Sequence, residues 1–276
     1  MGPILVTNDD GVGAMGLDVL ITSLRGLGHD VMVVVPAQNH SGRGHSVTLG
    51  PVRMDTQRFH TDTWGYVVTG TPVDCVRLAL AGACGTRPAM VVSGINHGWN
   101  VGHQILGSGT VAAAREAAWH QVPALALSAS EGASWETLTR MLLHFGDSWL
   151  MAAAQRRGQY LNINLPAAPA AVWCWVSLDP APIVPEVIPA TEPGRVQLLG
   201  RHQSSGAGQD AAPTDIQCVE QGTIAVTALQ AYPAVGDQGA PEECWHAPLM
   251  MSSYEEDEHD HGKSIRGVFP VGSDGV

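Results

Sequence analysis

Two adjacent acidic residues, Asp9 and Asp10, follow a short apolar run at the start of the chain. Neighbouring side chains of a strand point to opposite faces, so consecutive carboxylates converge on one ligand only where the strand has ended. Gly11 tolerates the turn that this requires. Carboxylates held close together repel one another unless one is protonated or a cation neutralises them, and a hard divalent ion bound through oxygen is one solution. The alternative is a solvated turn in which each carboxylate caps a backbone amide.

Three further polar segments carry groups that bind metal ions or phosphate. The amide oxygens of Asn96 and Asn100 are neutral ligands suited to Mg²⁺ or Mn²⁺. The glycine-rich segment 41–46 contains the Ser41 hydroxyl and the Arg43 cation. Segment 107–110 opens a predicted helix, so its amides and hydroxyls suit a phosphate group. Each segment taken alone is more typical of an ordinary loop.

Residues 11–16 form a literal GxGxxG between a predicted strand and a predicted helix, a pattern typical of dinucleotide-binding loops. The acidic residue that would hold the ribose belongs at the end of the second strand, where the sequence has Val35-Pro36-Ala37. Asp9 and Asp10 would also face the pyrophosphate as like charges. A dinucleotide-dependent oxidoreductase is therefore a weak alternative.

The elements that must position these residues alternate between apolar runs and helical patterns over the first 165 residues. Helices are predicted to follow the first strand, to begin at Thr71 and Ser134, and to cover 109–119. Continuous apolar strands between helices indicate an α/β fold whose mostly parallel sheet is covered on both faces. Such sheets bind ligands beyond the carboxyl ends of their strands, where the polar segments lie. The predicted buried strands are 4–7, 31–35, 90–93, 124–128 and 160–164.

The chain is predicted to divide into three parts. Residues 1–165 form the α/β core, in which 45–69 are a β-rich hairpin or an extension that leaves the sheet. Residues 166–253 form a smaller extension that packs on the core or on a partner subunit, with strands at 172–178, 196–199 and 223–229. Residues 254–276 form an acidic, histidine-containing tail, which we expect to be flexible and solvated rather than metal-binding.

Composition excludes several classes of protein. The 276 residues include 14 basic and 26 acidic side chains, a formal charge of −12 that argues against binding to duplex nucleic acid. No stretch of about twenty apolar residues predicts a membrane span, and no signal peptide is recognised. The five cysteines form no CxxC pair, which favours a reducing compartment. We therefore expect a cytoplasmic protein.

Six motifs occur in order along the chain: Val6-Thr7-Asn8-Asp9-Asp10-Gly11, Ser41-Gly42, His45-Ser46-Val47-Thr48-Leu49, Gly70-Thr71-Pro72-Val73-Asp74-Cys75-Val76, Ser93-Gly94-Ile95-Asn96-His97-Gly98 and Ser108-Gly109-Thr110-Val111. Together they resemble the SurE family of metal-dependent phosphatases, the survival-protein 5′/3′-nucleotidases. The resemblance extends over roughly residues 3–230, including Leu161–Pro166 and Thr214-Asp215. The chain departs from the family pattern at Gly13, Met15, His97 and Gly107, which surround the implied phosphate and base sites.

The resemblance implies a Rossmann-like core with a swapped or extended C-terminal part, assembled as a homodimer or homotetramer. It implies one divalent cation per subunit, Mg²⁺ or Mn²⁺, and hydrolysis of phosphomonoesters such as nucleoside 5′(3′)-monophosphates. The implied metal ligands are Asp9, Asp10, Ser41 and Asn96, of which Asp9, Asp10 and Asn96 are also catalytic. The implied phosphate-binding residues are Asn8, Gly42, Ser108, Gly109 and Thr110.

Two other functions and one other mechanism remain open at this stage. The altered positions leave room for a phosphatase acting on a specialised metabolite, or for a nucleotide-binding module without turnover. Either Asp9 or Asp10 can accept the proton of an attacking water. A covalent aspartyl-phosphate route is less favoured, because the two acids are adjacent rather than separated by one residue.

Overall fold

The computed structural model describes residues 2–189, 196–202 and 212–232, all of which belong to one compact unit. The predicted tail 254–276 and residues 233–253 of the predicted extension lie outside the described residues. The helices are α1 (Met15–Gly26), α2 (Pro72–Leu80), α3 (Gly109–Trp119), α4 (Trp135–Ala154) and α5 (Asp215–Glu220), with a 3₁₀ helix η1 at Gly102–Leu106. The strands are β1 (Ile4–Thr7), β2 (Val31–Pro36), β3 (Met54–Arg58), β4 (Trp64–Val68), β5 (Met90–His97), β6 (Ala124–Ala129), β7 (Gln159–Leu165), β8 (Trp173–Trp175), β9 (Ile183–Pro189), β10 (Val196–His202) and β11 (Ile224–Gln230).

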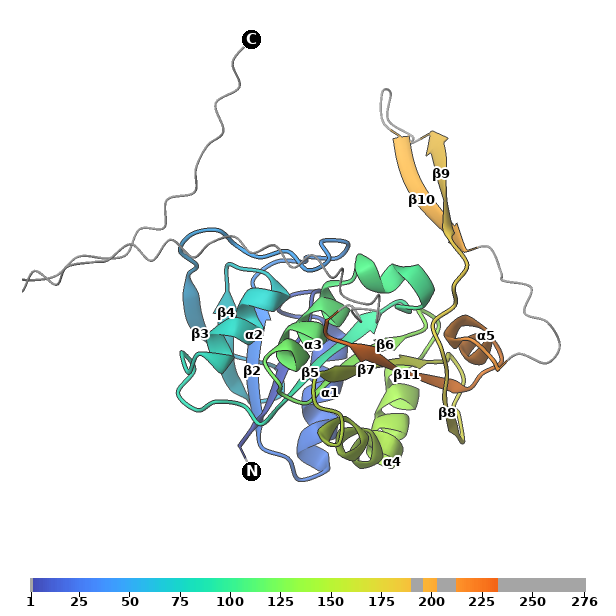
Figure 1. Cartoon of the computed structure of the whole chain (residues 1–276). Helices are drawn as coiled ribbons and strands as arrows, with labels where there is room; N and C mark the ends of the chain where they lie inside the picture. Colours follow the sequence, from blue (N-terminus) through green and yellow to red (C-terminus); the bar gives the residue numbers. More distant parts are fainter. Residues whose placement is uncertain (1, 190–195, 203–211, 233–276) are drawn as a thin grey trace, which may run out of the picture. The chain divides into compact units, whose positions relative to one another are not determined.

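Nine strands form one sheet in the order β3-β4-β2-β1-β5-β6-β7-β11-β8 (Figure 1). All neighbouring pairs are parallel except β3 with β4 and β7 with β11. The predicted α/β class with a mostly parallel sheet is therefore confirmed. The antiparallel pairs lie outside the central β2-β1-β5-β6 region, which is where a ligand site is expected.

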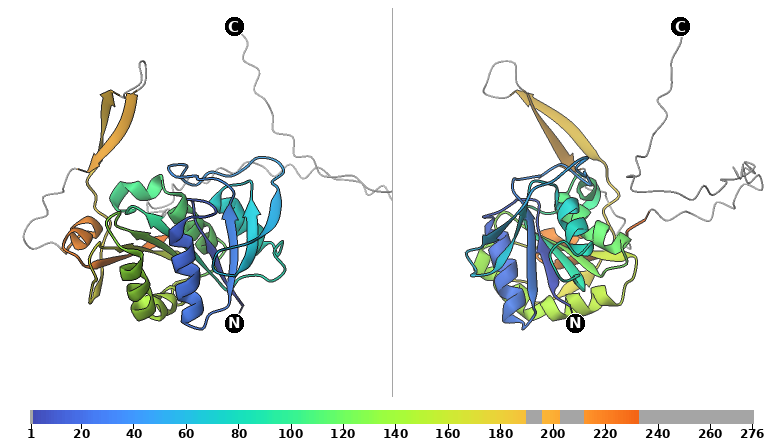
Figure 2. Two further views of the ribbon diagram at one scale, coloured as in Figure 1. Left: turned by 180° about the vertical axis from the view of Figure 1, so that it is seen from behind. Right: turned by 90° about the vertical axis from the view of Figure 1, so that its left-hand side faces the viewer.

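Helices cover both faces of this sheet, with α1 and α4 on one face and α2 and α3 on the other (Figures 1 and 2). Successive strand residues alternate between the two resulting cores, because side chains of a strand point to opposite faces. Val6 packs in the core below α1 and α4, whereas its neighbour Leu5 packs below α2 and α3. Both cores are built mostly from aliphatic side chains with a few aromatic ones, and their close packing holds the strand ends in fixed relative positions.

The β-rich part of residues 45–69 forms a hairpin that stays in the main sheet. Strand β3 pairs antiparallel with β4, and β4 pairs parallel with β2. Strand β5 also continues past the predicted end at Ser93 as far as His97, with a shift in its register to β6 between Ser93 and Asn96. Asn96 therefore lies on an irregular strand end rather than in a loop.

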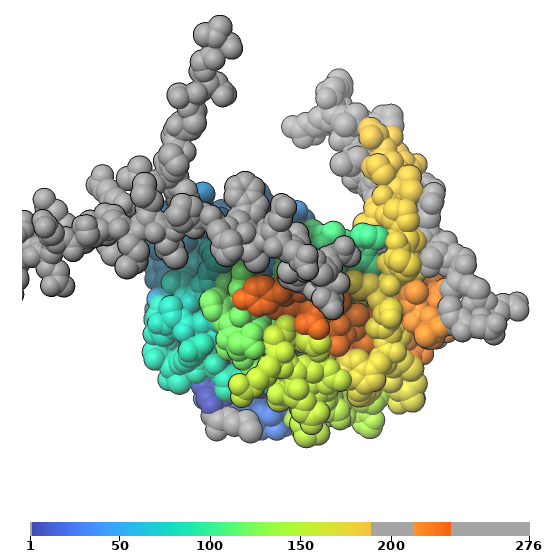
Figure 3. Space-filling model, viewed as in Figure 1, coloured from blue at the N-terminus to red at the C-terminus, as the bar shows by residue number. Residues whose placement is uncertain are grey.

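Two strands from the C-terminal segment complete the sheet. Strand β11 pairs antiparallel with β7, and β8 pairs parallel with β11. On the face drawn in Figure 3, the deep orange surface of residues 224–232 lies between the green surface of α3 and the yellow-green surface of α4. Strands β9 and β10 pair with each other in a separate two-stranded sheet. None of the described helices combines the length and apolar character needed to cross a lipid bilayer.

Candidate active site at the carboxyl ends of β1 and β5

The candidate site lies where the strand order changes direction. The chain runs from β1 to β2 on one side and later returns to β5 on the other side of β1. The strand order therefore reverses at β1. Ligands of open α/β sheets bind beyond the carboxyl ends of the strands at such a point. Thr7 is paired with Ser93, so Asp9 and Asp10 follow β1 at about the level of Asn96, where β5 resumes its pairing with β6 after the register shift.

A hydrogen-bonded turn fixes the two carboxylates. The Asn8 amide group donates to the Gly11 carbonyl oxygen at 2.9 Å and accepts from the Gly11 amide at 3.3 Å. Gly11 adopts a φ of 88°, a conformation that residues with a Cβ rarely adopt. Asn8 is buried, so its side chain shapes the turn and is not directed at solvent. The nitrogen and the oxygen of the Asn8 side-chain amide both bind Gly11, whereas the resemblance implied a contact of Asn8 with phosphate.

The carboxylate of Asp9 is held by the first turn of α3. Its Oδ2 accepts a hydrogen bond from the Gly109 amide at 3.1 Å, and its Oδ1 accepts one from the Thr110 hydroxyl. Asp9 is almost fully buried. The amide of Gly109 and the hydroxyl of Thr110, both expected at phosphate, are therefore directed at Asp9 in this structure. A helix N-terminus favours a negative charge, which offsets the cost of burying this carboxylate.

Glycine at position 109 is required by this contact. A Cβ at that position would lie 2.7 Å from the Cβ of Asp9 and 2.9 Å from its Oδ2. Ser108 caps the same helix, because its hydroxyl oxygen accepts the Val111 amide at 3.1 Å. The Ser108 hydroxyl proton takes no part in that bond and remains available to a ligand.

Asp10 is less buried than Asp9 and lies among groups from two other strand ends. Burial and the neighbouring charge of Asp9 raise the pKa of Asp10, whereas hydrogen bonds from the His97 backbone and the Ser41 side chain lower it. A carboxyl whose pKa rises beside a second carboxylate is typical of a site that accommodates a cation or a shared proton. The structure thus brings Asp9, Ser41 and the His97 backbone to Asp10, and Asn96 directly precedes His97 at the end of β5.

Asn39 is a site residue that the sequence reasoning did not select. Its amide nitrogen donates to Oδ1 of Asp10 at 3.3 Å, while its amide oxygen accepts from the Ser41 backbone amide at 2.7 Å. Asn39 therefore joins the loop after β2 to the turn after β1. Its place two residues before Ser41, in a polar segment after a buried strand, was the available signal.

The donor set suits a hard divalent cation. The Asn96 amide nitrogen donates to the Gly98 carbonyl oxygen at 2.8 Å, which leaves the amide oxygen as the free acceptor. Among the described residues no group of three or more His, Cys, Asp or Glu side chains could hold a metal ion. Two carboxylates, one amide oxygen and one hydroxyl are the oxygen ligands that Mg²⁺ and Mn²⁺ prefer. Gly42 is exposed beside Ser41, with a φ of 75°.

Comparison with known proteins gives one consistent family. The family model described as Survival protein SurE matches residues 4–179. A 5'-nucleotidase SurE of Synechococcus sp. (strain RCC307) is 35% identical over 263 residues, which cover 89% of this chain and 91% of the relative. The 5'-nucleotidase SurE of Xanthomonas campestris pv. campestris (strain B100) is 36% identical over 82% of this chain and 88% of the relative.

Other matches agree with these. The 5'-nucleotidase SurE of Chlorobaculum tepidum is 48% identical over 126 residues, which are 45% of this chain and 48% of the relative. The crystal structure of the SurE protein from Aquifex aeolicus superposes with a TM-score of 0.69 at 28% identity, covering 83% of this chain and 94% of that one. The fold, the site at the strand ends and these matches together place the chain in the SurE family.

Proposed function

We propose that this protein is a metal-dependent phosphomonoesterase that hydrolyses nucleoside 5′(3′)-monophosphates or a related small phosphate ester. The observation that carries the proposal is the pair of carboxylates, Asp9 and Asp10, at the switch point of the sheet. Asp9 is buried against a helix N-terminus, and Asp10 has a raised pKa. The relatives of this chain that are named 5'-nucleotidase support the same chemistry.

Asp9, Asp10, Ser41 and Asn96 would hold one Mg²⁺ or Mn²⁺. When bound, such a cation polarises a phosphoryl oxygen and orients a water molecule for attack. Gly109 and Thr110 keep Asp9 in place through their hydrogen bonds. The Ser108 hydroxyl and the exposed loop at Gly42 bind the remaining phosphoryl oxygens as their charge redistributes.

Asp10 is the residue that we propose as the acceptor of the water proton. The oxygens of Asp9 already accept hydrogen bonds from Thr110 and Gly109, so its carboxylate is held against α3. Asp10 is less buried than Asp9 and closer to solvent, so a water molecule can approach it.

The quaternary structure and the location in the cell stay predictions. We base the proposed homodimer or homotetramer on the β9–β10 hairpin, whose side chains Val184 and Val187 are exposed. Cytoplasmic localisation remains an expectation from the composition.

Release of inorganic phosphate tests the proposed function. The purified protein is assayed with p-nitrophenyl phosphate and with nucleoside 5′- and 3′-monophosphates, in the presence of Mn²⁺, Mg²⁺ or a chelator. We expect turnover with a metal, its loss with the chelator and its return when metal is added back. Phosphate release that is insensitive to the chelator would contradict the metal assignment. Nucleotide binding without any turnover would instead support a non-catalytic module.

A further inference from the structure

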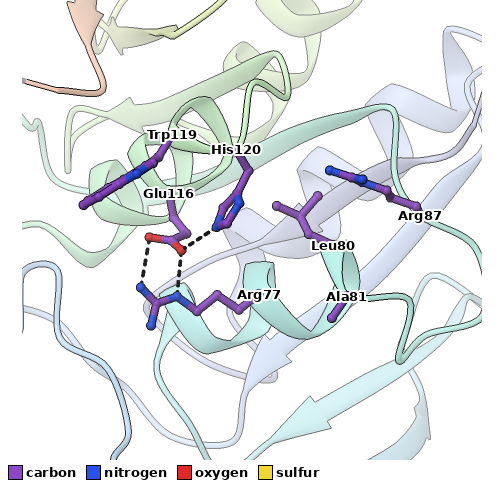
Figure 4. Close-up of a pocket in the computed structure, with 7 residues that line it drawn as sticks. All are labelled: Arg77, Leu80, Ala81, Arg87, Glu116, Trp119 and His120. Atoms are coloured by element: carbon purple, nitrogen blue, oxygen red, sulfur yellow. Dashed lines mark hydrogen bonds and ion pairs between the residues drawn. The ribbon is translucent and has the colours of Figure 1, made fainter. Parts of the chain in front are cut away.

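Glu116 is a buried carboxylate in the middle of α3, at the wall of a cavity of about 410 Å³ (Figure 4). Arg77 donates to it from α2 through Nε at 2.6 Å and Nη2 at 3.4 Å, and His120 approaches Oε1 at 3.1 Å. Its side chain is only 2% exposed. A buried charge of this kind is tolerated only when it is fully hydrogen-bonded, so every partner of Glu116 matters.

The third partner of Glu116 comes from the loop that carries Ser41. His45 Nε2 lies 2.8 Å from Oε2 of Glu116, and the Arg115 Nε donates to Nδ1 of His45 at 3.0 Å. Because Nδ1 accepts a hydrogen bond, the ring proton lies on Nε2 and points at the carboxylate. The imidazole is thus fixed by α3 at both of its nitrogens.

The start of this loop is attached to the turn after β1, because the His40 amide donates to the Asp9 carbonyl oxygen at 2.7 Å and the Asn39 side chain donates to Asp10 at 3.3 Å. Residues 41–45 form no regular secondary structure, and Ser41, Gly42 and Arg43 are exposed. Near its end the Gly44 amide donates to the Gly107 carbonyl oxygen at 2.8 Å. The His45 side chain and the Gly44 amide are therefore the two points at which the end of the loop is attached to α3 and the segment before it.

Helix α3 connects this attachment to the proposed site. Thr110 in its first turn holds Asp9, and Glu116 lies six residues further on, about 9 Å along the helix axis. One rigid helix thus contacts the turn after β1 at its N-terminus and the loop after β2 through Glu116. The turn after β1 thus contacts the start of the loop directly through His40, and α3 contacts the end of the loop through His45.

We propose that Glu116 and His45 are positioning residues, which hold the loop 41–45 so that Ser41 and Gly42 face Asp9 and Asp10. This inference rests on the proposed function, because it assigns the loop a part in binding metal and phosphate. Neither Glu116 nor His45 touches the substrate in this account. Their effect passes through the backbone of residues 41–44.

Paired variants of the full chain test this inference. His45→Leu removes the hydrogen bond that Glu116 makes to the loop, whereas His120→Leu removes a hydrogen bond from the same carboxylate without touching the loop. Three readouts are compared: kcat and KM for p-nitrophenyl phosphate, the dissociation constant of Mn²⁺ alone, and amide hydrogen exchange of residues 41–44 in metal-free protein. For His45→Leu we expect a loss in kcat/KM of at least about tenfold, weaker Mn²⁺ binding and faster exchange.

His120→Leu should stay within about twofold of the wild type in all three readouts. His45→Gln, whose amide can donate to Glu116, should recover most of the activity and Mn²⁺ affinity that His45→Leu loses. Arg115→Leu, which frees only the Nδ1 side of His45, should give a smaller loss of the same kind and serves if His45→Leu does not fold. Unchanged exchange and Mn²⁺ affinity in both His45→Leu and Arg115→Leu would overturn the inference, as would equal losses in His120→Leu. If the wild type releases no phosphate, the proposed function fails, and the exchange contrast still decides the positioning role.

Discussion

The Thr110 hydroxyl donates a hydrogen bond to Oδ1 of Asp9, so the first turn of α3 holds the carboxylate that follows β1. The Gly109 amide holds the other carboxylate oxygen at 3.1 Å. Each carboxylate oxygen has a second lone pair, which remains available to a cation. The helix therefore orients Asp9 and leaves it able to act as a ligand.

Thr110→Val should lower kcat for p-nitrophenyl phosphate by at least about tenfold and lower the unfolding temperature by a few degrees. Valine keeps the shape of threonine but leaves Oδ1 of the buried Asp9 without its donor, and a lost bond to such a group is worth about 1–3 kcal/mol. Steady-state kinetics at saturating Mn²⁺ measure the effect. Thr110→Ser keeps the hydroxyl and should retain most of the activity. Wild-type kcat in the valine variant would contradict the role given to this hydrogen bond.

Gly16→Ala should destabilise the protein by about 1–3 kcal/mol, because it overpacks the contact between α1 and β5. A Cβ at Gly16 would lie only 2.1 Å from the Ile95 carbonyl oxygen, directly before Asn96. Gly26→Ala, at the other end of α1, meets only the end of the Leu143 side chain at 3.3 Å and is the matched control. Thermal unfolding should show a fall of several degrees for Gly16→Ala and little change for the control. Equal stability of the two variants would contradict the close approach at Gly16.

The buried Glu116 should make stability depend on acid pH. Its hydrogen bonds from His45 and the hydrogen bonds and charge of Arg77, aided by His120, outweigh burial and lower its pKa to about 2. The ordinary value is near 4.5, so the stabilisation is fully present above about pH 5 and is lost as the pH falls toward 2. The difference in unfolding free energy between the wild type and Glu116→Gln should therefore shrink by about 3 kcal/mol between pH 6 and pH 2.

Urea unfolding at a series of pH values measures this difference. Glu136→Gln is the control, because Glu136 is exposed and pairs only with Arg140 across one helical turn. Its difference from the wild type should be small and nearly independent of pH in the same range. A flat difference for Glu116→Gln would show that this carboxylate is not stabilised in its charged form.

Local sequence patterns were sufficient to predict the central sheet and the place of Asp9 and Asp10 at the end of its first strand. Apolar runs between helical repeats predict parallel strands, and acids directly after a buried strand lie at their carboxyl ends. The end of β5 was predicted too early, because the pair Ser93-Gly94 has the composition of a turn. In the structure the pairing of β5 with β6 continues to His97. The insertion of β11 between β7 and β8 is a pairing between distant segments that no local pattern indicates.

Contacts between distant residues account for what the sequence did not predict at the site. Gly109 and Thr110 were expected at phosphate, yet their donors meet Asp9, about one hundred residues earlier in the chain. Glu116 left only a faint signal, a single acid in a helix whose neighbouring residues are mostly alanine. Its role depends on where the loop 41–45 folds back onto α3, which composition and spacing do not specify.

Binding of Mn²⁺ to the wild type and to Asp9→Asn tests the central claim most directly. Titration of the metal-free proteins, followed by calorimetry or by the electron paramagnetic resonance signal of free Mn²⁺, gives the stoichiometry and the dissociation constant. The account predicts one site per subunit in the wild type and its loss in Asp9→Asn, with phosphatase activity lost in parallel and the circular dichroism spectrum unchanged. Equal Mn²⁺ binding by a folded Asp9→Asn variant, or no binding by the wild type, would contradict it.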